Sequence, residues 1–146
     1  YDLTPYYGFE EDAIHWHRTA KDACDSFEQS IYPKFKESCD RYFYLPHRKE
    51  ARGIGGIFFD YKKNDFENDF KFVRDVGVTF QMLFNSIIKK KIKKKWTFKD
   101  KEMQYIKRGR YAEFNLLYDR GTKFGLQTGG NVEGILMSLP PIAKWK

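Results

Sequence analysis

Apolar side chains recur every three or four positions over two stretches near the start of the chain, which predicts two helices. The second helix has Pro33 in its first turn and ends at Pro46, and its apolar face consists of Ile31, Phe35, Cys39, Tyr42 and Phe43. His17 lies within the apolar face of the first helix, whereas His15 points to the opposite side because residues two apart do not share a helix face. The first face consists of Phe9, Ala13, Trp16, Ala20, Cys24 and Phe27.

A longer apolar stripe follows Asn64 and Asp65, either of which can cap a helix. Its spacings of four and three favour a helix that packs on a sheet, since a coiled coil needs a longer and more regular seam. The stripe runs into a lysine cluster, and it comprises Phe66, Phe70, Val73, Gly77, Phe80, Phe84 and Ile87. Beyond the cluster, Thr97 and Asp100 have capping-box spacing, which predicts a short helix ending near Gly109.

Four other segments have strand patterns. Residues 52–59 form a glycine-rich entry to a buried apolar run, and residues 112–119 alternate apolar and mostly polar side chains. Short strands are also expected over 123–127 and 135–139, with glycines at the intervening turns. This order of elements predicts an α+β fold with an antiparallel β-sheet flanked by helices. Because no linker or repeat interrupts residues 1–146, we expect a single domain.

The positive charge of the chain is concentrated in one segment. The net charge is +7, and six lysines between Lys89 and Lys95 account for all but one of those charges. A basic surface for nucleic acid is therefore not expected, and the lysines fit a solvated helix end favoured by the helix dipole. Attraction to phosphate backbones or anionic lipid remains the alternative. No apolar run approaches the ~20 residues of a membrane span.

The cysteines and histidines have no metal-binding spacing. Cys24 and Cys39 match no CxxC or zinc pattern and are expected to be free thiols on apolar helix faces. His17 and His47 are too far apart in sequence to form a specific metal motif. A histidine on an apolar helix face is more often a hydrogen-bonded core residue than a ligand.

Asp119 and Arg120 are the strongest candidates for binding chemistry. They end a predicted strand and enter a glycine turn, where the planar guanidinium could meet a carboxylate and the Asp could accept from N–H donors. The alternative is an ion pair that only closes the turn. At Gly129 and Gly130, backbone N–H groups can approach an anion because no side chain intervenes.

Several motifs together resemble the oxygen-dependent coproporphyrinogen III oxidases. They are Asp2-Leu3-Thr4-Pro5, His17-Arg18-Thr19, the segment from Arg52 to Asp60, and the stretch from Arg108 to Pro141. The resemblance runs from Asp2 to Trp145 and covers about the C-terminal half of the family's sequence. It implies that an N-terminal half, with a His-Phe-Asn-Tyr-Arg segment that lines the pocket, is missing. The chain is then a fragment, half of a two-chain enzyme, or a degenerate member.

The resemblance implies oxidative decarboxylation of coproporphyrinogen III to protoporphyrinogen IX, with molecular oxygen as co-substrate and no required cofactor. It assigns Asp2 to the pyrrole N–H groups and to proton removal, Arg120 to a propionate, and Asp119 to orientation or to a second N–H contact. Gly129, Gly130 and Asn131 correspond to a substrate loop that holds another carboxylate. Asn131 stands where the family commonly has Arg, and Gly134 where it commonly has Ser.

The resemblance also implies a homodimer in the cytoplasm, or in the mitochondrion for a eukaryotic member. A divalent metal at His17 and His47 is a further alternative carried by the family. Two other functions compete with catalysis: a non-catalytic, degenerate porphyrin-binding or dimerisation module, and a binder of anionic surfaces that acts through the lysines.

Overall fold

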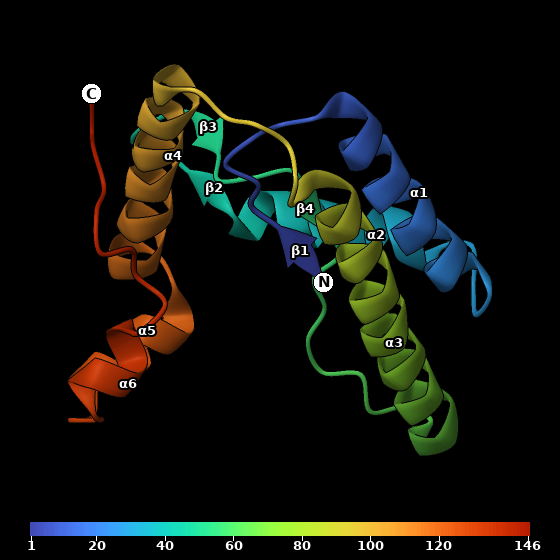
Figure 1. Cartoon of the computed structure of the whole chain (residues 1–146). Helices are drawn as coiled ribbons and strands as arrows, with labels where there is room; N and C mark the ends of the chain where they lie inside the picture. The colour runs from blue at the N-terminus through green and yellow to red at the C-terminus, as the bar shows by residue number, and fades with distance from the viewer. The chain divides into compact units, whose positions relative to one another are not determined.

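The computed structural model describes residues 1–146 and divides into two compact units, Tyr1–Lys95 and Trp96–Lys146 (Figure 1). The first unit contains three helices and four two-residue strands, and the second contains three helices. The expected α+β class with antiparallel strands is confirmed, although the strands are few and short. The single domain over residues 1–146 stays a prediction, since two compact units can still belong to one cooperative domain.

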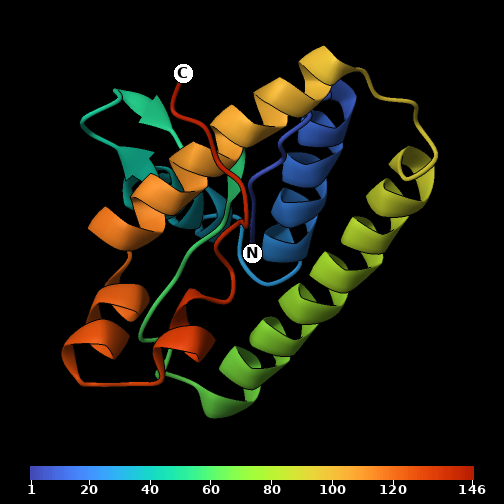
Figure 2. The same ribbon diagram turned by 60° about the vertical axis from the view of Figure 1, so that its left-hand side comes forward.

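The core of the first unit is formed by α1 (Glu10–Asp25), α2 (Ile31–Tyr42) and α3 (Phe66–Lys91). Helices α1 and α3 lie side by side (Figure 2). Trp16, Ala20 and Cys24 are fully buried on α1, so the face predicted from the sequence is confirmed. Around Trp16 pack Leu83 and Ile87 of α3, while Cys24 belongs to a second cluster with Phe72 and Val76.

Two small antiparallel sheets complete this unit. Strand β1 (Asp2–Leu3) pairs with β4 (Gly55–Gly56), and β2 (Tyr44–Leu45) pairs with β3 (Glu50–Ala51). A Cβ at Gly56 would lie 2.1 Å from the Tyr1 carbonyl oxygen, and one at Gly53 would lie 2.5 Å from that of Leu3. Glycine is therefore needed where these backbones meet. The strand predicted over 52–59 was wrong in extent, because only Gly55 and Gly56 have a strand partner.

Helix α3 buries a different face from the predicted one. Its buried residues are Phe72, Val76, Leu83 and Ile87. Of the predicted stripe, Phe66, Phe70 and Val73 are exposed, whereas Ile87 is buried and Phe80 and Phe84 are partly buried against the core. The helix carries apolar residues on two adjacent faces, and the spacing alone does not show which face packs on α1.

The second unit contains α4 (Phe98–Leu117), α5 (Arg120–Gln127) and α6 (Val132–Leu136). The capping box at the start of α4 is confirmed: Thr97 Oγ1 accepts from the Asp100 amide, and the Asp100 carboxylate accepts from the Thr97 amide. The short strands expected over 123–127 and 135–139 are wrong, because these residues lie in helices and turns.

The strand expected over 112–119 is also wrong, because α4 continues through Gly109 to Leu117. Gly109, Ala112 and Glu113 are buried, and the last two lie three and four residues after Gly109, as on one helix face. A brief alternation of apolar and polar residues does not exclude this helical pattern. Gly109 does not end the helix. A Cβ there would lie 2.3 Å from the Lys144 carbonyl oxygen, so this glycine admits the last residues of the chain against α4.

Both cysteines are buried free thiols, as predicted. Burial raises the pKa of Cys24 to about 11 and that of Cys39 to about 12. No helix is long and apolar enough to cross a membrane.

Candidate functional site

Asp2 forms an ion pair with Arg52 inside the first unit. Asp2 lies on β1 opposite Gly56, and the glycines beyond Arg52 bring that segment against the N-terminal residues. Arg52 Nη2 donates to Asp2 Oδ2, and Arg52 Nε donates to Thr4 Oγ1 at 3.0 Å. The guanidinium also stacks over the Phe43 ring, 4.0 Å from its centre.

This pairing gives the Asp2 carboxylate a fixed orientation. The side chain of Arg52 is 8% exposed and that of Asp2 is 27% exposed, so the pair is buried on the arginine side and open to solvent on the carboxylate side. A buried guanidinium needs such acceptors, since an uncompensated charge in the interior is costly. The sequence contained both residues in matching motifs but gave no signal that they pair.

His17 is held by hydrogen bonds within the protein. Its Nε2 lies 2.7 Å from the Ile54 carbonyl oxygen, and its Nδ1 lies 3.1 Å from the Tyr32 hydroxyl. Because a carbonyl only accepts, Nε2 carries the proton, and in the neutral ring Nδ1 accepts from Tyr32. This arrangement does not fit a metal ligand, which needs a free nitrogen lone pair.

His47 lies in the turn between β2 and β3. No group of three or more His, Cys, Asp or Glu side chains in the structure could hold a metal ion. The structure therefore places no further metal ligands together with His17 or His47.

Asp119 and Arg120 lie at the first turn of α5 rather than at a strand end. Asp119 is the N-cap of α5, and its Oδ2 accepts from the Thr122 amide at 2.7 Å. Arg120 is the first residue of the helix and is exposed. The guanidinium and the positive end of the helix dipole both favour an anion at this corner. The Asp119 cap fixes the direction in which Arg120 leaves the backbone.

The predicted substrate loop follows the other end of α5. Gly129 has φ +72°, a left-handed conformation typical of the residue that ends a helix. The Gly130 amide donates to the Gly125 carbonyl at 3.0 Å, so this N–H group is used within the chain. Asn131 caps α6, with its Oδ1 accepting from the Glu133 amide at 3.1 Å.

The structure therefore separates the candidates into groups. Asp119 and Arg120 begin α5 and the 129–131 loop follows it, and an eight-residue helix is about 12 Å long. Both groups belong to the second unit, whereas Asp2, His17 and His47 belong to the first. The role of Asn131 as a helix cap was missed, although Asn before a short apolar run is a cap signal.

Comparison with known proteins gives one consistent result. The family model described as coproporphyrinogen III oxidase matches residues 1–146. The chain is 57% identical over 145 residues to oxygen-dependent coproporphyrinogen-III oxidases of Rickettsia bellii (strain OSU 85-389) and Rickettsia rickettsii (strain Sheila Smith), and 56% identical to that of Rickettsia akari. These matches cover 99% of this chain and 52% of each relative. The chain spans about half the length of the curated relatives it matches.

Proposed function

Because this chain belongs to the coproporphyrinogen III oxidase family, we propose that it supplies part of an enzyme that converts coproporphyrinogen III to protoporphyrinogen IX. The observation that carries the proposal is the match over the whole chain to relatives named as oxygen-dependent enzymes of this activity. In each decarboxylation, a propionate loses a hydrogen from the carbon next to the pyrrole, and the bond to its carboxyl carbon breaks. A vinyl group and CO2 form. The hydrogen leaves with its two bonding electrons, and these electrons, its proton and one proton from the carboxyl group convert O2 to hydrogen peroxide.

Asp2 is the residue we assign to the pyrrole N–H groups. Its carboxylate is oriented by Arg52 on its buried side and remains open to solvent on the other. A carboxylate held in this way can accept from N–H donors of a macrocycle and receive a proton from them. Arg52 is a positioning residue in this scheme, because it acts through Asp2.

Arg120 is the residue we assign to a propionate of the substrate. The guanidinium of this exposed residue and the N-terminal amides of α5 are the kind of donors that form charge-assisted hydrogen bonds with a carboxylate. Asp119 orients this corner through its cap on Thr122. The loop of Gly129, Gly130 and Asn131 is assigned to a second carboxylate by resemblance.

The test uses a chimera in which this chain replaces the matching 145 residues of the Rickettsia bellii oxidase. We expect the chimera to form the divinyl product from coproporphyrinogen III and oxygen, whereas this chain alone does not. Asp2→Asn and Arg120→Ala are each expected to lower kcat/KM at least tenfold, about 1.4 kcal/mol or more. Lys123→Ala, an exposed cation on the same helix, is the control and should leave the kinetics unchanged. Unchanged kinetics for Arg120→Ala would remove this residue from the site.

A non-catalytic, degenerate porphyrin-binding module is the second candidate, and Asn131 is the observation that favours it. An amide in place of an arginine removes one charge-assisted contact to a carboxylate. A folded chimera that binds porphyrin and forms no product would support this module over the enzyme. The homodimer and the cytoplasmic location remain part of the enzyme proposal, and sedimentation of the chimera tests the dimer.

A further inference from the structure

Helix α3 carries an apolar stripe whose large side chains are exposed within the first unit. We call it the outer stripe. Residues on it recur at helical spacings, so they share one face of the helix. Phe66 is 78% exposed, Phe70 is 59% exposed and Val73 is 49% exposed. The outer stripe consists of Phe66, Phe70, Val73, Gly77 and Ile88.

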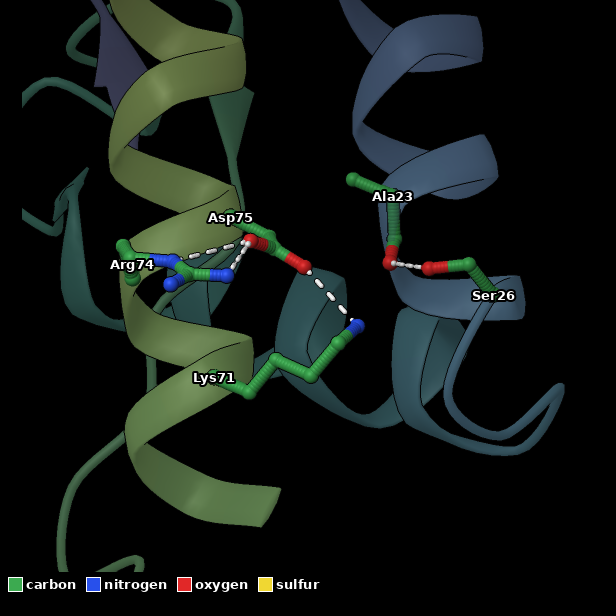
Figure 3. A network of polar contacts seen from close by, with 5 residues as sticks. All are labelled: Ala23, Ser26, Lys71, Arg74 and Asp75. Atoms are coloured by element: carbon green, nitrogen blue, oxygen red, sulfur yellow. Dashed lines mark hydrogen bonds and ion pairs between the residues drawn. The ribbon is translucent and has the colours of Figure 1, made fainter. Parts of the chain in front are cut away.

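The outer stripe differs from the polar side of α3, which has the features of a solvated surface. Lys71 Nζ donates to Asp75 Oδ2 at 3.1 Å, and Arg74 donates to the other oxygen of the same carboxylate (Figure 3). The helix thus has a buried face, a polar face and, between them, the outer stripe. A helix that is apolar on more than its core face is usually covered on both sides.

Gly77 lies in the middle of the outer stripe, and nothing in the structure requires a glycine there. A Cβ at this position would meet no atom within 4 Å. Gly53, Gly56 and Gly109, in contrast, each admit a backbone oxygen 2.1–2.5 Å from where a Cβ would be. A glycine inside a helix is destabilising because it loses more backbone freedom on folding, so it requires compensation. The close neighbour that would compensate is absent from Gly77 in this structure.

We propose that the outer stripe binds the part of the family's polypeptide that this chain does not match, with a backbone segment of that part crossing α3 at Gly77. The length of the relatives suggests what covers the outer stripe. This chain matches 52% of each relative, so the unmatched part of the relative is a polypeptide of similar size. Phe66 and Phe70 supply a large apolar contact at the N-terminal end of the outer stripe; their stacked rings have centroids 6.1 Å apart. The lysines after Ile88 end the contact at the other.

The decisive substitution is Gly77→Ala, made in this chain alone and in the chimera with the Rickettsia bellii oxidase. In the isolated chain the new methyl group enters open space and alanine favours the helix, so the Tm should rise. In the chimera the methyl group meets the crossing backbone, so the Tm should fall. Val78→Ala is the matched control: Val78 is 50% exposed on another side of α3, and its replacement should shift both Tm values in the same direction.

Either uniform result for Gly77→Ala overturns the proposal. A rise in both proteins would mean that no backbone approaches Gly77. A fall in both would mean that the stripe is already covered in the isolated chain, by its own residues 96–146 or by a second copy. Phe70→Ser gives an independent measurement, because it should lower the Tm of the chimera more than that of the isolated chain. Equal effects would also contradict the proposal, and neither readout depends on turnover.

Discussion

Arg52 donates to the carboxylate of Asp2 across fifty residues of chain, and this pair joins the first strand to the glycine-rich segment that lies against it. The guanidinium is nearly surrounded, by Phe43 on one face and by Thr4 at Nε. The residue that we assign to the substrate is thus also the principal charge partner of a buried cation. Structural and chemical roles are combined in Asp2.

Arg52→Met is expected to lower the free energy of unfolding by about 2–3 kcal/mol, less than the loss of one partner in a fully buried pair because Asp2 is partly exposed. Urea unfolding of the isolated chain measures this. Arg41→Ala is the control, since the Arg41–Glu37 pair lies on the surface and should contribute less than about 1 kcal/mol. Equal losses in the two variants would show that the Asp2–Arg52 pair is not buried.

Asn131→Arg is expected to have two opposite effects in the chimera. It restores the residue that the family commonly carries, so KM for coproporphyrinogen III should fall. It also removes the cap of α6, which costs about 1 kcal/mol and should lower the Tm. Asn131→Asp keeps a capping oxygen without the positive charge, and its KM should not fall. If Asn131→Arg lowers the Tm but leaves KM unchanged, the loop does not hold a carboxylate.

The pairing of Lys91 with Glu11 makes a pH-dependent contribution to the first unit. Lys91 Nζ lies 2.8 Å from Glu11 Oε1, which lowers the pKa of Glu11 and raises that of Lys91. The Glu11 part of the stabilisation is present above its unfolded pKa and is lost as the pH falls through the lowered folded value. The Lys91 part is present below its unfolded pKa and is lost as the pH rises through the raised folded value.

The stability difference between the parent and Lys91→Met should therefore be largest between about pH 5 and 10, given unfolded pKa values of about 4.3 and 10.4. Urea unfolding over this range measures the difference. Lys91→Met also removes the contact of Lys91 with the Phe9 ring and its ion pair with Asp12, whose Oδ2 lies 3.1 Å from Nζ. The contact with Phe9 involves no carboxylate, so the loss of stability on the acidic side tests the pairs with Glu11 and Asp12 together. Lys90→Met is the control. If its stability difference from the parent falls in the same way at acidic pH, the Lys91–Glu11 pair is not the cause.

Gly109→Ala tests the approach of the last residues to α4. Its methyl group would lie 2.3 Å from the Lys144 carbonyl oxygen, so the segment must move, at a cost of about 1–3 kcal/mol. Movement should also break the bond from the Lys144 amide to the Tyr105 carbonyl and speed hydrogen exchange at that amide. Gly121→Ala should have little effect, since its nearest neighbour lies at 3.4 Å. Slow exchange in Gly109→Ala would contradict the observed packing.

Local signals in the sequence predicted helix starts. The Thr97 cap depends on a residue three positions away, so the start of α4 could be inferred. The end of α4 could not, because Gly109 serves a contact with Lys144 that lies far along the chain. Which of the two apolar faces of α3 is buried also could not be inferred, because it depends on contacts with α1, which lies far away in the sequence.

Which residues form the site stays a prediction, and their geometry could not be inferred from the sequence. The chemistry of Arg120 and Asp119 follows from their side chains, but their place at a helix start depends on α4 continuing to Leu117, where a strand was expected. The partner of Asp2 was out of reach because no local pattern relates residues 2 and 52. Asn131 was judged only by the arginine it replaces, although its cap is a local feature.

The two cysteines allow the opening of the first unit to be measured. Both thiols are fully buried there, and residues 96–146 contain none. Because a thiol reagent reacts only with an exposed thiolate, its rate of incorporation reports the opening of residues 1–95. Opening of residues 96–146 exposes no thiol of that unit and adds no reaction of its own. The rate of opening of one part of the chain can therefore be measured in the intact molecule, without cutting the two apart.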